Sequence, residues 1–230
     1  MTSTNPTNGA TSPELANTVQ DIINRTNDFR QAEGLEEVKP NPQLMEAAED
    51  FTQFMASTDQ YGHTADGSTP AERAKQHGYN PCIISENIAY QFRTSGFTSQ
   101  ELGREFVQGW QESPEHRKNM LGPAVTETGV GVAQSAQTHY YYAVQMFGRP
   151  QTEMIEFQIT NRTETPISYA MEGQTFPLPP RSTRTHQQCQ SAEITFQWPE
   201  KQEQTVVQPQ PGDQYTIVQG DAGLFRLQKD

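Results

Sequence analysis

Three polar residues carry side chains that could bind a metal ion or transfer a proton: His63, Glu86 and His116. His63 lies in a loop, Glu86 opens a largely apolar segment, and His116 falls in the first turn of a predicted short helix. At that position the helix dipole disfavours the imidazolium, and neutral imidazole is the form that binds metals or accepts protons. Two histidines and a carboxylate suit a zinc site with one open position. They equally suit an acid/base pair that polarises water.

The same residues also admit a structural interpretation. The two histidines are far apart in sequence, unlike a His-x-x-x-His motif in which one helix presents both ligands. Each histidine taken singly is more often an ordinary surface or hydrogen-bonded side chain, and Glu86 can be a buried carboxylate held by backbone N–H groups. The other histidines lack an acidic or glycine-rich setting, so we interpret them as structural: His77, His139 and His186.

Capping signals predict five helices before position 121. Each signal is a side chain that can accept a hydrogen bond from the first turn, followed by proline or by an acidic residue three positions on. In chain order they are Ser12-Pro13, Asn41-Pro42, Thr69-Pro70 with Glu72, Thr98 with Glu101, and Ser113-Pro114. The first helix is expected to end at Gly34 and the third at Gly78. The last one places His116 near its third position.

Strand patterns occupy the rest of the chain. Residues 83–92 have strand character, and 128–133 with 139–147 are typical of an antiparallel hairpin. Gly129 and Gly131 in that hairpin indicate close approach of another backbone or side chain. After position 150, short β segments separated by Pro/Gly-rich turns predict a small sandwich or partial barrel. These segments are 154–160, 167–170, 193–198, 204–207, 214–218 and 224–227.

Composition excludes several classes of partner. The 230 residues carry a net charge of −12 with a sequence pI of about 4.8, whereas binding to nucleic acid or an anionic membrane needs clustered Lys and Arg. No stretch approaches the roughly 18 apolar residues of a membrane helix. Residues 1–12 show no signal-peptide pattern and are expected to be a disordered leader or the remnant of an engineered start. Because the pattern changes to short β segments after position 150, we expect two folded domains, 13–150 and 151–230.

The chain contains two cysteines, Cys82 and Cys189. Two cysteines do not define a disulfide framework, so a Cys82–Cys189 bridge and two free thiols are both open. A bridge would help a small β domain with a marginal core.

A series of short motifs, taken in order, resembles the CAP superfamily, also called the SCP domain. This is the family of cysteine-rich secretory proteins, venom antigen five and plant pathogenesis-related proteins. The resemblance is closest to its bacterial branch and covers about residues 15–150. The motifs are Gly34-Leu35, Asn41-Pro42-Gln43-Leu44, Met55-Ala56, His63, Arg73, Gly78-Tyr79, Glu86-Asn87-Ile88-Ala89, Trp110, Ser113 through Leu121, Gly129-Val130-Gly131-Val132, and Tyr142 through Gly148.

The resemblance implies an α+β fold, an α-β-α sandwich with a three-stranded antiparallel sheet between helical layers. It also implies a central cleft lined by two histidines and two acidic residues, where some members bind zinc or another divalent ion. His63, Glu86 and His116 match three of these positions. The fourth position, an acidic residue in many members, falls on Ser113 in this sequence. The acidic residues beside it are Glu112 and Glu115.

Three functions follow as hypotheses. The first is a secreted or envelope-located, non-enzymatic binding module. Its cleft would take a divalent metal ion, zinc above all, and its partner would be a lipid or sterol-like molecule or an extracellular protein. The second is a metal-dependent, protease-like hydrolase with Glu86 as general base. The third is a cleft of purely structural value, with binding carried by the C-terminal β domain. These alternatives make different predictions for substitutions at His63, Glu86 and His116.

Overall fold

The computed structural model describes residues 12–199, 202–220 and 223–230. Most of the predicted leader, residues 1–11, lies outside the described residues. The chain divides into two compact units, Met1–Pro150 and Gln151–Asp230. Each unit is described by itself below.

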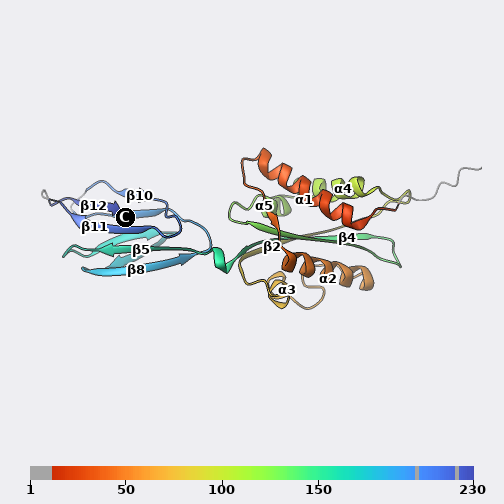
Figure 1. The fold of residues 1–230 in the computed structure, drawn as a ribbon, viewed down its shortest axis with the longest axis horizontal. Coiled ribbons are helices and arrows are strands. Elements are labelled where there is room, and N and C mark those ends of the chain that lie inside the picture. Colours follow the sequence, from red (N-terminus) through yellow and green to blue (C-terminus); the bar gives the residue numbers. More distant parts are fainter. Residues whose placement is uncertain (1–11, 200–201, 221–222) are drawn as a thin grey trace, which may run out of the picture. The chain divides into compact units, whose positions relative to one another are not determined.

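The first unit is an α-β-α sandwich, as predicted (Figure 1). Its sheet has the order β1-β3-β4-β2, and both β3 and β2 pair antiparallel with β4. Helices α1, α4 and α5 cover one face, and α2 and α3 cover the other. The strands are β1 (Lys39–Pro40), β2 (Pro81–Gln91), β3 (Glu127–Gln134) and β4 (Tyr141–Pro150). The helices are α1 (Leu15–Ala32), α2 (Pro42–Thr58), α3 (Pro70–Gln76), α4 (Ser99–Glu112) and α5 (Pro114–Met120).

The sheet has one strand more than expected. β1 spans two residues and runs parallel to β3, held by hydrogen bonds from Lys39 N to Thr126 O and from Asn41 N to Thr128 O. A two-residue strand carries no alternation of apolar and polar positions, so the sequence pattern could not reveal it.

The predicted capping boxes are present at Thr69 and Thr98, and the Asn41 side chain caps α2. The prediction for the first helix is wrong at its start, because α1 is capped by Glu14 without a side-chain hydrogen bond. Ser113 is the N-cap of α5, but its side chain makes no capping hydrogen bond.

Helix α2 lies directly on β3 at the predicted glycines. A Cβ atom on Gly129 would lie 2.1 Å from the backbone carbon of Leu44, and one on Gly131 would lie 2.4 Å from the Ala48 carbonyl oxygen. Two hydrophobic cores fill the two sides of the sheet, one around Trp110 and one around Phe51. The close approach of α2 places the loop that follows it beside β2.

The second unit is a β-sandwich of two four-stranded sheets, ordered β10-β9-β6-β7 and β12-β11-β5-β8. Its core combines side chains from both sheets, including Phe157, Tyr169, Phe196 and Ile217. The strands are β5 (Ile155–Asn161), β6 (Ile167–Met171), β7 (Gln174–Leu178), β8 (Ser182–Gln188), β9 (Ile194–Gln197), β10 (Thr205–Val207), β11 (Gln214–Gln219) and β12 (Phe225–Lys229).

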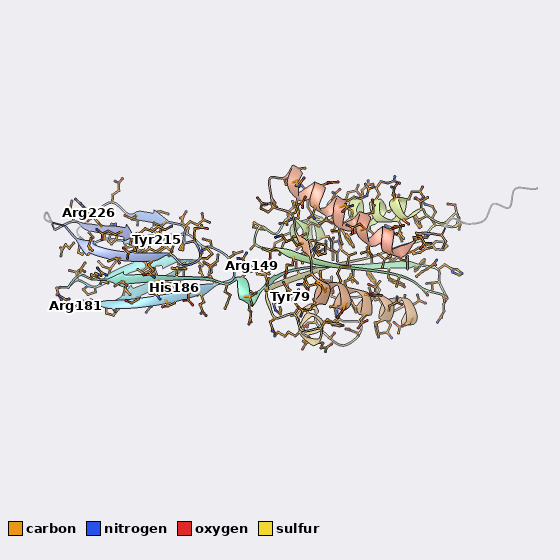
Figure 2. All side chains as sticks on the ribbon, in the orientation of Figure 1. Tyr79, Arg149, Arg181, His186, Tyr215 and Arg226 are labelled. Atoms are coloured by element: carbon orange, nitrogen blue, oxygen red, sulfur yellow. The ribbon has the colours of Figure 1, made fainter. Side chains whose placement is uncertain are left out.

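Two of these strands, β7 and β8, are absent from the sequence prediction. β8 has the sequence STRTHQQ, with no aliphatic residue on its half-buried face. That face carries His186, which Figure 2 labels. The His186 ring stacks on Phe157, with 5.1 Å between ring centroids, and its Nε2 lies 2.6 Å from the Tyr169 hydroxyl. Both strands lie at sheet edges, where polar residues and Pro177 are tolerated.

Candidate functional site

Glu86 lies on β2 with its side chain only 1% exposed, and both of its carboxylate oxygens have partners. Oε1 lies 2.8 Å from Nδ1 of His63, which belongs to the loop after α2. Oε2 accepts a hydrogen bond of 2.7 Å from Nη2 of Arg73 on α3. The structure thus brings the predicted site residues His63 and Glu86 together and adds Arg73 to them.

Arg73 is the centre of a buried polar network. Its side chain is 3% exposed, and Nη2 also donates to the His63 carbonyl at 3.0 Å. Nη1 lies 3.1 Å from Asp66 Oδ1 and donates to the Ser68 carbonyl at 2.8 Å. The guanidinium carbon lies 3.6 Å from the ring centroid of Phe51. Arg73 therefore fixes the loop that carries His63 and neutralises the buried Glu86.

Sequence reasoning did not identify Arg73 as a site residue. It appears there only as one landmark of the family resemblance, and its position on a short polar helix gives no sign of burial. One signal was available: a buried glutamate such as Glu86 requires a cation or several hydrogen-bond donors as partners.

His116 occupies the predicted third position of α5 and is half-buried. Burial lowers the pKa of His116, and the nearby His63 lowers it further. The backbone of α5 is tied to β2 by two asparagines. Asn87 donates to the His116 carbonyl at 3.1 Å, and Asn119 donates to the Glu86 carbonyl at 3.2 Å. The two histidines thus approach the same part of β2 from opposite helical layers.

Three ring nitrogens in this cluster have no hydrogen-bond partner among the described residues: Nε2 of His63 and both nitrogens of His116. The Nδ1 of His63 is occupied by Glu86. Within the described part of the chain, no group of three His, Cys, Asp or Glu side chains forms a ready metal site. Any ion bound here would therefore be held by two imidazoles, with its other positions filled by water or a ligand.

The acidic residues next to Ser113 do not join this cluster. Glu112 ends α4, and its Oε1 accepts from Gln108 at 2.8 Å. Glu115 is exposed in the first turn of α5. Among the described contacts, neither carboxylate is paired with His63, Glu86 or His116.

Two other histidines lie outside the cluster in the first unit. His77 forms an ion pair with Asp50 at 2.9 Å. Although burial opposes it, the Arg73 carbonyl and the Asp50 carboxylate together raise the pKa of His77. The expectation that His77 lacks an acidic setting is therefore wrong. His139 is exposed and has a backbone φ of 59°.

Neither Cys82 nor Cys189 is a free thiol, and both are disulfide-bonded. Their pairing with each other within one chain stays a prediction from the sequence. We expect peptide mapping without reductant to recover one cross-linked peptide pair containing Cys82 and Cys189. A disulfide-linked dimer on a non-reducing gel, lost in Cys189→Ser, would contradict intrachain pairing.

The first unit identifies the class of protein to which the chain belongs. The sequence pattern of the cysteine-rich secretory protein family (CAP) matches residues 23–147. The chain belongs to this family.

The chain is similar to several bacterial proteins. The uncharacterized protein YkwD of Bacillus subtilis is 30% identical over 115 residues, which are 50% of this chain and 42% of YkwD. An extracellular SCP-domain protein of Bacillus anthracis is 27% identical, with a TM-score of 0.50 over 59% of this chain and 41% of that one. A cysteine-rich secretory protein of Staphylococcus aureus is 18% identical, with a TM-score of 0.47 over 59% and 40%. This chain thus spans less than half the length of these relatives.

Proposed function

We propose that the protein is a non-enzymatic binding module whose central cleft takes a divalent, zinc-like cation through His63 and His116. The observation that carries the proposal is that both imidazole rings have nitrogen atoms without a described hydrogen-bond partner. Nε2 of His63 and the ring of His116 have no described protein partner, while Glu86 occupies Nδ1 of His63. A half-exposed histidine held in one orientation is an available ligand.

Glu86 serves this site as a positioning residue. A carboxylate that accepts the Nδ1 proton of a histidine fixes the tautomer and leaves Nε2 able to bind a metal ion. Arg73 holds the carboxylate from the other side at 2.7 Å. A bound zinc-like ion would supply a Lewis-acid position for an oxygen or nitrogen atom of a ligand.

The hydrolase hypothesis fits this geometry less well. A general base must reach the proton of a water molecule or substrate within hydrogen-bond distance. Both oxygens of Glu86 already have partners and the side chain is 1% exposed, so the carboxylate would first have to release His63 or Arg73. This arrangement favours binding over turnover.

The location and the partner class rest on the family. We propose an extracellular or cell-envelope location, supported by the extracellular relative from Bacillus anthracis. A lipid or sterol-like molecule or an extracellular protein is the partner that the family resemblance suggests. No helix among the described residues combines the length and apolar character needed to cross a bilayer.

Zinc titration tests the cleft. Isothermal titration of metal-free protein with ZnCl₂ should give saturable binding that His63→Ala/His116→Ala abolishes. His139→Asn is the matched control, because it removes an exposed histidine elsewhere and asparagine tolerates the positive φ of that position. Equal binding by the wild type and the double variant would contradict the site. If neither binds zinc and the double variant melts several degrees lower, the cleft is structural.

A further inference from the structure

Exposed aromatic side chains gather on the first unit around the C-terminal end of β2, the strand that carries Glu86. Tyr61, Tyr90 and Phe92 are 47%, 51% and 49% exposed, and they are three of the five large exposed hydrophobic residues in the described chain. With the half-buried Tyr140 they form a continuous surface, which we call the aromatic ledge. Tyr90 stacks on Tyr140 at 5.3 Å between centroids, and Phe92 meets Tyr140 edge-on at 5.4 Å.

The ledge is held in place by the fold. Tyr90 lies on β2, and the hydroxyl of Tyr61 donates to the Ile88 carbonyl on the same strand at 3.1 Å. Beneath them the buried Tyr142 donates to Asp59 at 3.0 Å. Rings that are already ordered lose little conformational entropy on binding a ligand, as in tyrosine-rich binding surfaces.

The aromatic residues of the ledge carry no charge themselves, and the one carboxylate beneath them has its oxygens occupied by hydrogen bonds. The carboxylate of Asp59 is occupied by Ser135, Thr138 and Tyr142. The protein as a whole has a net charge of −12, which repels polyanions. A matching ligand therefore has apolar faces for the rings and is not a polyanion.

A cavity of about 390 Å³ adjoins the ledge at Phe92. Its wall includes Phe92, Arg93, Thr94, Gln134 and His139. The guanidinium of Arg93 is paired with the carboxylates of Glu101 and Glu105. Amide, hydroxyl and imidazole groups both donate and accept hydrogen bonds. Pockets that join aromatic surface to a few such groups are typical small-ligand sites.

We propose that the aromatic ledge and this cavity bind an uncharged oligosaccharide. A pyranose ring presents a C–H face that stacks on an aromatic ring, and its edge carries hydroxyl groups that both donate and accept. A proline-rich peptide also docks on aromatic grooves, but its prolines have no N–H to donate. The one cationic group of the cavity wall, Arg93, is already paired with Glu101 and Glu105, and the other polar groups both donate and accept hydrogen bonds. The ledge and its cavity thus match a sugar chain better than a polyproline helix. The site does not use His63 or His116, so it goes beyond the metal cleft and is independent of it.

Isothermal titration calorimetry of the full chain tests the proposal, with chitohexaose, cellohexaose and mannohexaose as separate ligands. At least one sugar should bind the wild type, and Tyr90→Ala and Tyr140→Ala should each weaken its binding about three- to tenfold. Tyr90→Phe keeps the ring and should bind within twofold of the wild type. Leu224→Ala, which truncates an exposed residue of the β unit, should bind like the wild type.

Three results would overturn the proposal. The first is that none of the sugars binds at millimolar concentration. The second is equal binding by the wild type and Tyr90→Ala/Tyr140→Ala. The third is that decaproline or phosphatidylcholine vesicles, rather than any sugar, bind in a Tyr90-dependent manner, which would assign the ledge to a peptide or a membrane. Zinc titration of Tyr90→Ala should match that of the wild type, so failure of this site is distinguishable from failure of the metal cleft.

Discussion

Arg73→Met is expected to lower the free energy of unfolding by about 3–5 kcal/mol, because it leaves the charge of Glu86 buried without its cation. The two groups are 3% and 1% exposed and lie 2.7 Å apart. Methionine keeps an apolar chain but removes the guanidinium that lies over Phe51, so the loss reports the ion pair together with that contact. Urea denaturation at pH 7, followed by circular dichroism, measures the change.

Two comparisons sharpen this result. Arg93→Met removes a half-exposed arginine that pairs with Glu105 at 3.1 Å, and should cost less than about 1 kcal/mol. The double variant Arg73→Met/Glu86→Met removes both buried charges and should be more stable than Arg73→Met alone. If the double variant loses as much as the sum of both single variants, the pair is not coupled and our account of it is wrong.

Gly129→Ala is expected to destabilise the first unit by about 3 kcal/mol, at the upper end of the usual cost of overpacking. The added Cβ would lie 2.1 Å from the Leu44 carbon and 2.5 Å from the Met45 nitrogen, both backbone atoms of α2. A helix backbone cannot rotate away as a side chain can, so α2 must shift as a whole. Thermal and urea unfolding both measure the loss.

Gly109→Ala provides the matched control. Gly109 lies on the exposed side of α4, has no positive φ, and has nothing within 4 Å of an added Cβ. Alanine there should stabilise the protein by about 0.5–1 kcal/mol, because it favours the helix. If Gly129→Ala and Gly109→Ala had the same small effect, the contact between α2 and β3 would not be close-packed.

The elements of the first unit could be predicted where a local signal exists. The caps at Asn41, Thr69 and Thr98 work through side-chain hydrogen bonds to neighbouring backbone, which depend only on residues a few positions apart. The predicted helix start at Ser12-Pro13 was wrong: α1 begins after Glu14, although Ser12 is a favourable cap residue. The sequence pattern did not predict strand β8, because its buried contacts come from His186 and Arg184 rather than from aliphatic residues.

The candidate site could also be predicted only in part from the sequence. His63, Glu86 and His116 are chemically conspicuous, and the pairing of His63 with Glu86 follows from their types. The burial of Arg73 depends on how α3 docks against β2, a long-range contact that no local pattern encodes. The acidic neighbours of Ser113 illustrate the converse, since residues adjacent in sequence point to different surroundings at a helix junction.

The hydrogen bonds around β2 bear on how the protein behaves at high concentration. β2 is the last strand of the described sheet, so its outer backbone groups face no further strand. Yet the Ile88 carbonyl accepts from Tyr61 and from Trp110 Nε1 at 3.3 Å, and the Glu86 carbonyl accepts from Asn119. Side chains thus occupy two of the acceptors in the middle of β2 that another molecule's strand would need in order to extend the sheet. The packing that holds the cleft in shape therefore also protects this edge against intermolecular β-pairing and aggregation.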